Sequence, residues 1–518
     1  MLKSTTHRKA YIFFISCLAA SLSLGKFPMS LSLIGLSLNW LLELEFQLKW
    51  KNIKEKNYLP IIFSGLFLVE LFWLLFSQDI TIGLNVLRIK TPLLLLPIII
   101  GSSNSFSKRE WKIVISTFFI GILVSTFWVY LVSLEILPTK KDSGTIRDAS
   151  IFMSHIRYSV LLSFSGVLLL YLAIKKQINK PLAFIVFFWL LFLIFKLATI
   201  TAILGLSSAL LFIFISLLFF YKNQSKTLYI VGIATLFFLA GLYTTVIFND
   251  FHHIKTKERS LKTFSIGGEK YQQDLKDNTR ENGYYLWENI AEKELERTWN
   301  RKSEISFKSK DKKQQPLKAT LYRFLTSKGL DKDSASLAAL TQTEIQKIEN
   351  GETSSVSYSN FETRIRALLY EWESKKKDSD PNDQTINQRI VFWKTGIDIF
   401  LRNPIFGHGP GGVKLEYKKN YKNQKTNLKK GNQLLAHNQF ITQALNLGIV
   451  GATIWLFIIL YSFFKVEKEL TLLVIPYLLL MFFAFMSDDM LEVQAGVTIF
   501  SFFGTLLLFY NSKSLEAS

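Results

Sequence analysis

The feature that most constrains this chain is the gathering of its apolar residues into long runs. Of its 518 residues 49% are hydrophobic, with 45 Phe and only 11 Pro. The runs are about 17 to 25 residues long, the length at which an α-helix spans a bilayer. Lipid requires each backbone polar group to find its partner within the same element, which favours long helices and excludes soluble folds. The sequence therefore predicts an all-α polytopic membrane protein.

Twelve membrane spans are predicted. They cover residues 10–25, 27–44, 58–77, 80–100, 111–134, 156–174, 181–197, 199–221, 227–248, 437–464, 469–486 and 490–510. Lys and Arg concentrate in alternate connections, whereas the turns "SQD" (77–79), "LAT" (197–199) and "SDD" (487–489) contain neither. The positive-inside rule then places both ends of the chain in the cytoplasm.

The predicted organisation has four parts: residues 1–248 with nine spans, 249–436 as an external domain, 437–511 with three spans, and 512–518 as a cytoplasmic tail. Because nine spans precede it, the polar stretch lies outside the cytoplasm. Its segments "LWENIAEKELERTW" and "DKDSASLAALTQTEIQKIENG" have helical periodicity, with an Asp or Ser start and a Gly stop. The Lys-rich stretch 414–433 is either a solvated loop or a contact for anionic lipid head groups.

Composition limits the partners and cofactors. The net charge of +21 could indicate nucleic-acid binding, but no nucleic-acid-binding motif accompanies it. Cys17 is the only cysteine, so a disulfide framework and a thiolate metal site are excluded. The six histidines lack the spacing of metal ligands. We expect membrane lipids rather than nucleic acid as partners, and neither metal nor cofactor.

Basic residues inside or beside apolar runs are candidate functional groups, because ionisable groups in a membrane are energetically expensive. Arg88 and Lys90 lie in the fourth predicted span, before Pro92 and Pro97. Both could simply extend to the membrane surface. The two prolines instead favour a broken helix beside a cavity.

A second group is "SHIRYS", where His155 and Arg157 stand at the outer start of the sixth predicted span, after a polar loop that contains Arg147. Basic residues at an outer boundary oppose the positive-inside rule. Their presence favours an anionic ligand.

The third candidate is Arg389, in "INQRIVFWKTGIDIF" (386–400). The residues Ile386, Ile390, Trp393, Ile397 and Phe400 of this segment form one apolar stripe, as in an interfacial amphipathic helix. A guanidinium beside such a stripe can grip phosphate oxygens with two hydrogen bonds. Arg364 and Arg366 have a similar setting but are expected to be mainly structural.

The fourth candidate is His437, at the outer start of the tenth predicted span, where Asn438 can cap the helix. An isolated histidine is most often structural. An imidazole that titrates near neutral pH is, however, the natural general base for activating a sugar hydroxyl.

The run "NPIFGHGPGG" (403–412) has glycines in the G-x-G-x-x-G spacing of dinucleotide-binding loops. Such a loop follows a buried strand and opens a helix. Here the run follows an amphipathic helix, and Pro410 stands where a helix should begin. We interpret it as a chain reversal, because Gly adopts conformations that other residues resist. It would place Arg389 on one side and His437 on the other.

The ordered motifs "R-x-x-x-W" at Arg389 and Trp393, "NPIFGHGPGG", and "HNQF" followed by "LGIVG" resemble the bacterial O-antigen ligase and polymerase superfamily of inner-membrane proteins. Twelve spans with a large loop between the ninth and tenth strengthen the resemblance. The segment "TLYRFLTSKGLDKDSASLAALT" also resembles the periplasmic insert of a ligase-like branch. The resemblance implies a bacterial inner-membrane protein whose site faces the periplasm.

The resemblance implies transfer of a glycan from undecaprenyl diphosphate to a sugar hydroxyl of the lipid A core, without metal or nucleotide. His437 would accept the proton of the acceptor hydroxyl, and Arg389 would bind the diphosphate. The further diphosphate-binding candidates are Arg157, Arg147, His155 and either Lys90 or Arg88.

One position departs from the family pattern. Where the family has Ser-Arg-Thr before the eighth span, this chain has "LATITAIL", with Ile200 at the Arg position. Either Lys196 or another basic group compensates, or that Arg is dispensable here.

Two alternatives remain. The first is a polymerase of the same superfamily, which extends glycan on glycan and shares the candidate residues. The second is a transporter of polysaccharide or lipid-linked glycan, although transporters commonly contain internal repeats and none is found here.

Overall fold

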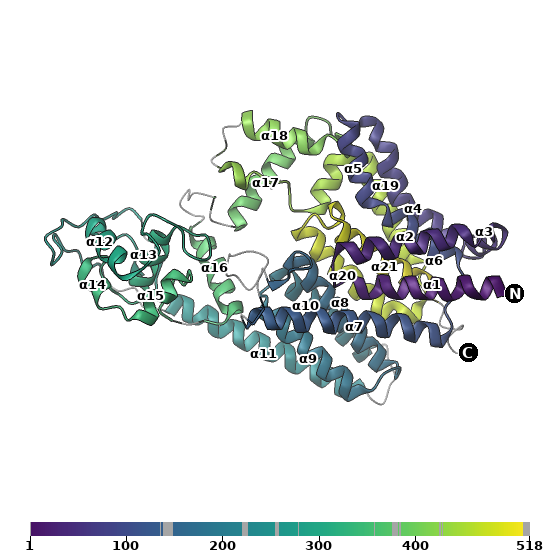
Figure 1. Ribbon diagram of the computed structural model, residues 1–518, viewed down its shortest axis with the longest axis horizontal. Coiled ribbons are helices and arrows are strands. Elements are labelled where there is room, and N and C mark those ends of the chain that lie inside the picture. The colour runs from purple at the N-terminus through teal and green to yellow at the C-terminus, as the bar shows by residue number, and fades with distance from the viewer. Residues whose placement is uncertain are drawn as a thin grey trace. The chain divides into compact units, whose positions relative to one another are not determined.

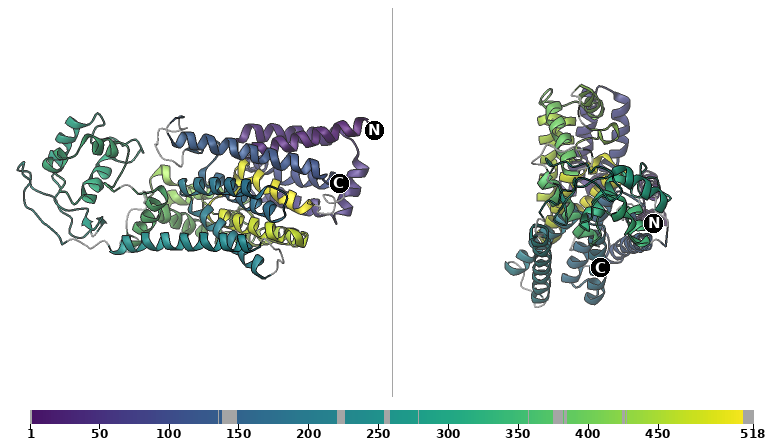
Figure 2. Two further views of the ribbon diagram at one scale, coloured as in Figure 1. Left: turned by 90° about the horizontal axis from the view of Figure 1, so that it is seen from below. Right: turned by 90° about the vertical axis from the view of Figure 1, so that its left-hand side faces the viewer.

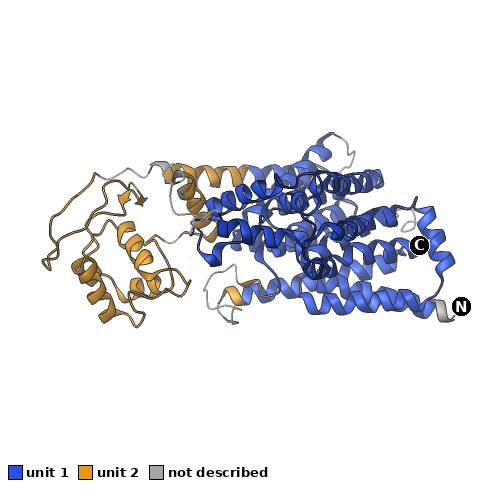
Figure 3. Cartoon of the chain, turned by 90° about the horizontal axis from the view of Figure 1, so that it is seen from above, with its two compact units in different colours: residues 1–131, 152–237, 379–518 blue, residues 132–151, 238–378 orange. Residues whose placement is uncertain are grey.

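The computed structural model describes residues 2–134, 136–137, 149–219, 226–253, 258–277, 279–356, 358–374, 382, 385–423, 426 and 428–510. These residues are mainly helical, and their named strands are the two-residue β1 (Arg280–Glu281) and β2 (Tyr284–Tyr285). The all-α prediction is confirmed. The chain divides into two compact units (Figure 3): unit 1 comprises 1–131, 152–237 and 379–518, and unit 2 comprises 132–151 and 238–378.

The helices that precede the long polar stretch are α1 (Leu2–Ser21), α2 (Lys26–Leu42), α3 (Phe46–Glu55), α4 (Leu59–Trp73), η1 (Leu74–Phe76), α5 (Ile80–Lys90), α6 (Pro92–Ser102), α7 (Lys108–Ser133), α8 (His155–Ile174), α9 (Lys180–Lys196), α10 (Ile200–Phe219) and α11 (Lys226–His253). Unit 1 continues with α17 (Thr385–Phe400), α18 (Val413–Asn423), η5 (Lys430–Asn432), α19 (Gln439–Phe464), η6 (Lys468–Leu470), α20 (Thr471–Ser487), η7 (Met490–Glu492) and α21 (Gln494–Phe509) (Figure 1).

Each of the twelve predicted spans coincides with helical structure, but fewer helices meet the requirements of a span. Within the described residues, eight are long and apolar enough to cross a membrane, or nine if the bent pair α2 and α3 counts as one. Residues 181–197 and 490–510 form α9 and α21, of only 17 and 16 residues. α1 carries several basic residues in its first turns. By length and composition the described residues thus contain eight or nine candidate spans, against the twelve predicted.

The helices of unit 1 pack in two sets of neighbours. α8 contacts α9, α10 and α20, while α4 contacts α6 and α19, and α21 contacts α6. In α8, 89% of the most apolar stretch of 18 residues is buried, the highest share among the candidate spans. The start of α1 and the end of α21 lie at the same end of the helix bundle (Figures 1 and 2).

The predicted break at Pro92 is present. α5 ends at Lys90 and α6 begins at Pro92, because proline lacks the amide that would continue the helical ladder and its ring clashes with the preceding turn. At the other end of α5, the Asp79 carboxylate caps the helix by accepting a hydrogen bond from the Ile82 amide at 2.9 Å. The break places Lys90 in the interior of unit 1, where it is fully buried.

α17 confirms the predicted helix over 386–400 but buries a different face. Phe392, Thr395, Gly396 and Ile399 are buried, and this face packs against α18 and α19. The predicted apolar stripe is only partly covered, and its Ile397 is 53% exposed. Trp393 and Phe400 of the stripe pack against the core on this side of the protein, so the stripe is only in part available to lipid.

The glycine run 403–412 is a chain reversal, as predicted, and it is hydrogen-bonded to α19 at a kink in that helix. Gly448 interrupts α19 with φ 62°. The amides of His408 and Gly409 donate to the carbonyls of Leu445 and Asn446 at 2.8 and 2.9 Å. The run therefore takes up hydrogen-bonding groups that the helix releases at its kink.

The glycine run leaves no room for a bound phosphate. α18 does begin directly after it, at Val413, although Pro410 was expected to prevent a helix there. However, the Gly411 amide donates to the Ser77 hydroxyl at 3.0 Å, and a Cβ on Gly411 or Gly412 would collide with backbone oxygen atoms. Protein atoms fill the space that a nucleotide would need.

Unit 2 contains α12 (Glu292–Lys302), α13 (Leu317–Ser327), α14 (Ser334–Ala338), α15 (Gln342–Glu349) and α16 (Asn360–Ser374). The core of the small helical part includes the buried Trp299, Phe307, Leu321, Phe324 and Ile345. The pattern over 331–351 forms two helices rather than one. The predicted external segment 249–436 is divided between the units, since residues 379–436 belong to unit 1.

The contact between the glycine run and α19 predicts the effect of Gly407→Ala. Gly407 has φ +67°, and an added Cβ would lie 2.5 Å from the Gly448 amide nitrogen. The left-handed conformation alone costs a non-glycine residue about 1–3 kcal/mol. We expect Gly407→Ala to lower the midpoint of thermal unfolding of the purified protein in detergent by several degrees.

Gly232→Ala is the matched control, because a Cβ there has open space around it and alanine is the better helix former. Equal unfolding midpoints for the two variants would contradict the packing described here.

Candidate functional site

The turn Ser487–Asp488–Asp489, which we term the acidic turn, begins at the last residue of α20 and precedes η7. All three residues are buried. Residues from three other segments, namely Arg157 of α8, Arg389 of α17 and His437 before α19, contact this turn. The three basic candidates that the sequence predicted from distant segments are thus brought together.

The motif "R-x-x-x-W" joins α17 to two loops. Arg389 Nη2 donates to the Ser487 carbonyl at 2.9 Å. Trp393 Nε1 donates to the Ala436 carbonyl at 3.0 Å. Residues four apart lie on one face of a helix, so one side of α17 holds both the acidic turn and the residue that precedes His437.

Asp488 lies between two basic side chains. Arg157 Nη2 is 2.7 Å from Asp488 Oδ2, and His437 Nδ1 is 3.7 Å from Oδ1. The second distance is too long for a hydrogen bond and is an electrostatic contact. The His437 side chain is 37% exposed, against 5% for Asp488. Because Nδ1 faces Asp488, Nε2 is the ring nitrogen that remains for a substrate.

Asp489 holds the backbone around His437. Its carboxylate accepts hydrogen bonds from the amides of His437 at 3.0 Å and Asn438 at 3.2 Å, and from the Thr442 hydroxyl at 2.7 Å. His437 has φ 47°, a conformation that a side-chain-bearing residue adopts only when its surroundings enforce it. Burial raises the pKa of the Asp489 carboxyl.

Asn438 caps α19, as predicted. Its side-chain oxygen accepts from the amides of Phe440 and Ile441 at 3.0 and 3.2 Å. The cap fixes where the helix begins, and therefore fixes His437 one residue before it. It does not hold the imidazole ring, since Asp488 is the group beside Nδ1.

A second polar cluster is buried inside unit 1. Lys90 Nζ lies 2.7 Å from both Glu70 Oε1 and Glu492 Oε1. Gln443 Nε2 donates to Glu70 at 2.9 Å, and Gln439 Nε2 donates to Glu492 at 3.4 Å. Glu492 follows the acidic turn by three residues. The cluster therefore connects α4, α5, α19 and η7.

The other predicted site residues have separate settings. Lys90 was expected to be available for a diphosphate, but its ammonium is enclosed by two carboxylates, because a buried charge requires compensation. Arg88 is exposed on α5, and His155 is half-buried as the first residue of α8. Arg147 lies outside the described residues.

Two further residues from the sequence have structural contacts. Lys196, the possible replacement for the basic group missing at Ile200, lies 4.9 Å from the centre of the Tyr130 ring. Arg366 pairs with Glu362 at 2.9 Å inside unit 2. Neither contact involves the acidic turn.

The sequence reasoning missed the carboxylates. Glu70 lies within a predicted span, and Asp488, Asp489 and Glu492 lie at the edges of two others. A carboxylate at such a position is as costly as a basic residue. The signal was present in "SDD", which was used only as evidence for an outer turn.

The buried cluster predicts that Lys90→Ala strongly destabilises the protein, because the buried Glu70 carboxylate and the partly buried Glu492 carboxylate lose their counter-charge. Removing one partner of a buried ion pair costs about 3–5 kcal/mol. Lys51→Ala is the control: Lys51 and its partner Glu55 are 70% and 60% exposed, and such pairs contribute at most about 1 kcal/mol. Thermal unfolding in detergent measures the stability of both variants. Equal losses of stability in Lys90→Ala and Lys51→Ala would contradict the buried cluster.

Comparison with known proteins gives one family. No curated protein matches the chain by sequence. Residues 338–456 match the family model described as O-antigen ligase. This range includes Arg389, the glycine run, His437 and the kink of α19. Over these 119 of its 518 residues, the chain is therefore similar to the O-antigen ligase family.

Proposed function

We propose that this protein is a membrane glycosyltransferase that transfers a glycan from undecaprenyl diphosphate to a hydroxyl of a lipid A-core or similar glycolipid, without metal or nucleotide. The observation that carries the proposal is the convergence of Arg157, Arg389 and His437 on the acidic turn. The match of residues 338–456 to the O-antigen ligase family model supports a ligase-type or polymerase-type transfer.

His437 is the proposed general base. As the acceptor oxygen forms its bond to the anomeric carbon, His437 Nε2 takes the hydroxyl proton. The bond between the anomeric carbon and the phosphate oxygen breaks, and undecaprenyl diphosphate leaves with the electron pair. Asp488, 3.7 Å from Nδ1, stabilises the imidazolium. General-base catalysis of this kind contributes about 10²–10⁴-fold in rate.

Arg157 and Arg389 are the proposed diphosphate clamp. Arg157 Nε is buried and has no hydrogen-bond partner among the described residues, so it retains a donor for a phosphate oxygen. The bond from Arg389 Nη2 to Ser487 fixes the orientation of that guanidinium. Fixed cations in a water-poor site stabilise the charge that develops on the leaving diphosphate.

The remaining basic candidates have graded roles in this proposal. Arg88 is exposed and can contribute a further contact to the diphosphate, as can the half-buried His155. Lys90 acts as a positioning residue instead. It pairs with Glu492, which lies three residues after the acidic turn, and so helps to fix the position of that turn. Arg147 stays a weaker candidate.

The proposed setting is the bacterial inner membrane, with the acidic turn on the periplasmic side and both ends of the chain in the cytoplasm. The turn contains no basic residue, as expected for an outer connection. The start of α1, which carries Arg8 and Lys9, lies at the same end of the bundle as the end of α21 (Figure 1). This arrangement supports a shared cytoplasmic side.

The function is tested by offering the purified protein an undecaprenyl-diphosphate-linked glycan and a lipid A-core acceptor. We expect transfer without ATP, and we expect His437→Ala to lower the rate by about 10²-fold or more.

Arg389→Lys should also reduce transfer strongly, because an ammonium cannot replace the planar fork of the guanidinium. Arg402→Lys is its control, since Arg402 lies just after α17, is 46% exposed and pairs loosely with Glu416 at 3.6 Å.

Full activity of His437→Ala would overturn the catalytic assignment. The product separates the two members of the superfamily: a glycan on the lipid acceptor indicates a ligase, whereas a longer lipid-linked glycan with an unmodified acceptor indicates a polymerase. Movement of the donor across a bilayer without any transfer would indicate a transporter.

A further inference from the structure

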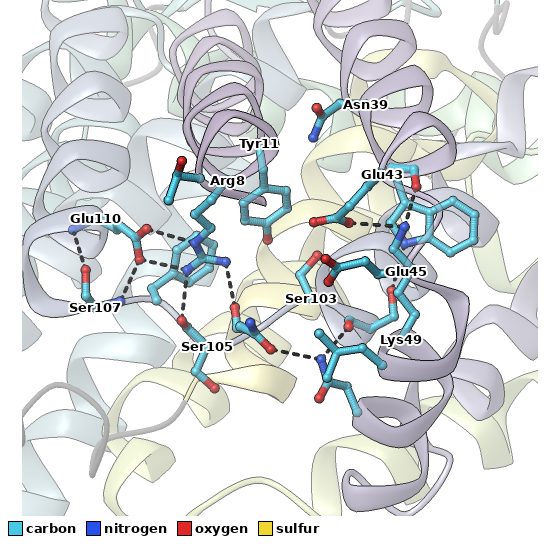
Figure 4. Close-up of a pocket in the computed structure, with 17 residues that line it drawn as sticks. Arg8, Tyr11, Asn39, Glu43, Glu45, Lys49, Ser103, Ser105, Ser107 and Glu110 are labelled. Atoms are coloured by element: carbon cyan, nitrogen blue, oxygen red, sulfur yellow. Dashed lines mark hydrogen bonds and ion pairs between the residues drawn. The ribbon is translucent and has the colours of Figure 1, made fainter. Parts of the chain in front are cut away.

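A polar cavity of about 530 Å³ lies between the first half of α1, the end of α2, α3, the end of α6 and the start of α7 (Figure 4). Its volume is within the range of about 300–1,000 Å³ typical of ligand pockets. Its ionisable lining residues are Arg8, Tyr11, Glu43, Glu45, Lys49 and Glu110. All belong to unit 1, and the acidic turn contributes nothing to this cavity.

The basic groups of the cavity already have acceptors. Arg8 donates from Nε and Nη2 to Glu110 at 2.8 and 2.7 Å, and from Nη1 to the Asn104 carbonyl at 2.9 Å. Lys49 Nζ donates to the Trp40 carbonyl at 2.5 Å and lies 3.1 Å from Glu43 Oε2.

Carboxylates outnumber cationic side chains in the cavity, since two cations face three carboxylates. The described part of the chain provides no hydrogen bond or ion pair for the carboxylate of Glu45, which is exposed. A ligand with positive charge and N–H groups would complement this lining.

Tyr11 gives an independent indication of a ligand. It is 5% exposed, and its hydroxyl, which lies near the Ser103 side chain, makes no well-aligned hydrogen bond among the described residues. Figure 4 shows this hydroxyl and the carboxylates of Glu43 and Glu45 pointing toward the centre of the cavity. A buried polar group without a partner costs about 1–3 kcal/mol, so a ligand that hydrogen-bonds to the hydroxyl gains affinity there.

An apolar surface adjoins the cavity. α2 and α3 meet at an angle of 109°, and Leu42, Leu44 and Trp50 around this bend are 66%, 68% and 48% exposed. Leu48 lines the cavity and is itself 39% exposed. Exposed apolar residues next to a polar cavity suit a ligand with a polar head and apolar tails, and Trp is enriched at membrane interfaces.

We propose that this cavity binds the primary-ammonium headgroup of a zwitterionic phospholipid. The ammonium lies between Glu43 and Glu45 and donates to the Tyr11 hydroxyl. The phosphate lies toward Lys49 and the polar segment 102–105, and the acyl chains cover the exposed apolar residues of the bend. A choline headgroup has no N–H donor and binds more weakly. This site is independent of the proposed transfer reaction.

The test is native mass spectrometry of the full-length protein, stripped of lipid in detergent and then offered phosphatidylethanolamine, phosphatidylcholine or phosphatidylglycerol at equal concentration. We expect one tightly retained phosphatidylethanolamine. Loss of a charge-assisted hydrogen bond in Glu45→Gln should weaken this retention about tenfold. Tyr11→Phe, which removes one oxygen atom, should weaken it about threefold or more.

Glu55→Gln is the matched control, since Glu55 is on α3 but exposed outside the cavity. Circular dichroism and thermal unfolding establish that each variant is folded. Equal retention of phosphatidylglycerol would overturn the proposal in favour of an anion site. Displacement of the lipid by an equal concentration of free ethanolamine would indicate a soluble amine site. Identical retention by Glu45→Gln and Glu55→Gln would also refute it.

Discussion

The ion pair between Arg157 and Asp488 is the interaction on which the rest of the site depends. A carboxylate that is 5% exposed cannot remain charged at low cost without a partner close by. Arg157 supplies that partner from α8, the most enclosed of the candidate spans. The acidic turn is therefore fastened to the interior of the bundle. Asp489, the next residue, then fixes the backbone at His437, and Arg389 holds the turn through Ser487.

The kink in α19 extends this organisation into the protein interior. In a straight helix, the carbonyls of Leu445 and Asn446 would accept hydrogen bonds from amides one turn further along α19. Here they accept from the amides of His408 and Gly409 instead. Before the kink, Gln439 and Gln443 lie on the same short segment as the cap at Asn438, and both reach the Lys90 cluster. The glycine run thus contributes to the site by holding a helix segment, and not by binding phosphate.

Much of this fold follows from local chemistry and could be predicted. Apolar runs of spanning length become helices, Pro92 breaks one of them, and Asn438 caps another, because each effect depends on a few neighbouring residues. Arg157, Arg389 and His437 could be selected because polar groups at membrane edges are costly. Their meeting point could not be derived, because the acidic turn brings together segments more than 200 residues apart in the chain.

The differences between the predicted and the observed structure also have physical causes. Lys90 is paired internally because two distant glutamates meet it, which no local pattern reveals. α17 buries the face that contains Phe392 and Ile399, because Gly396 on the same face allows α19 to approach closely. α9 and α21 are apolar but have only 17 and 16 residues, since the length of a helix is set by where the neighbouring turns begin.

The central claim, that Asp488 and Arg157 act as one unit beside His437, is tested most directly by a double-mutant cycle. The rate of glycan transfer is measured for Asp488→Asn, Arg157→Gln and the double variant in the purified protein. Residues that act as a unit give strongly non-additive effects. We predict that the double variant is about as impaired as the more impaired single variant. Effects that multiply would mean that the two side chains act separately, and would contradict the account.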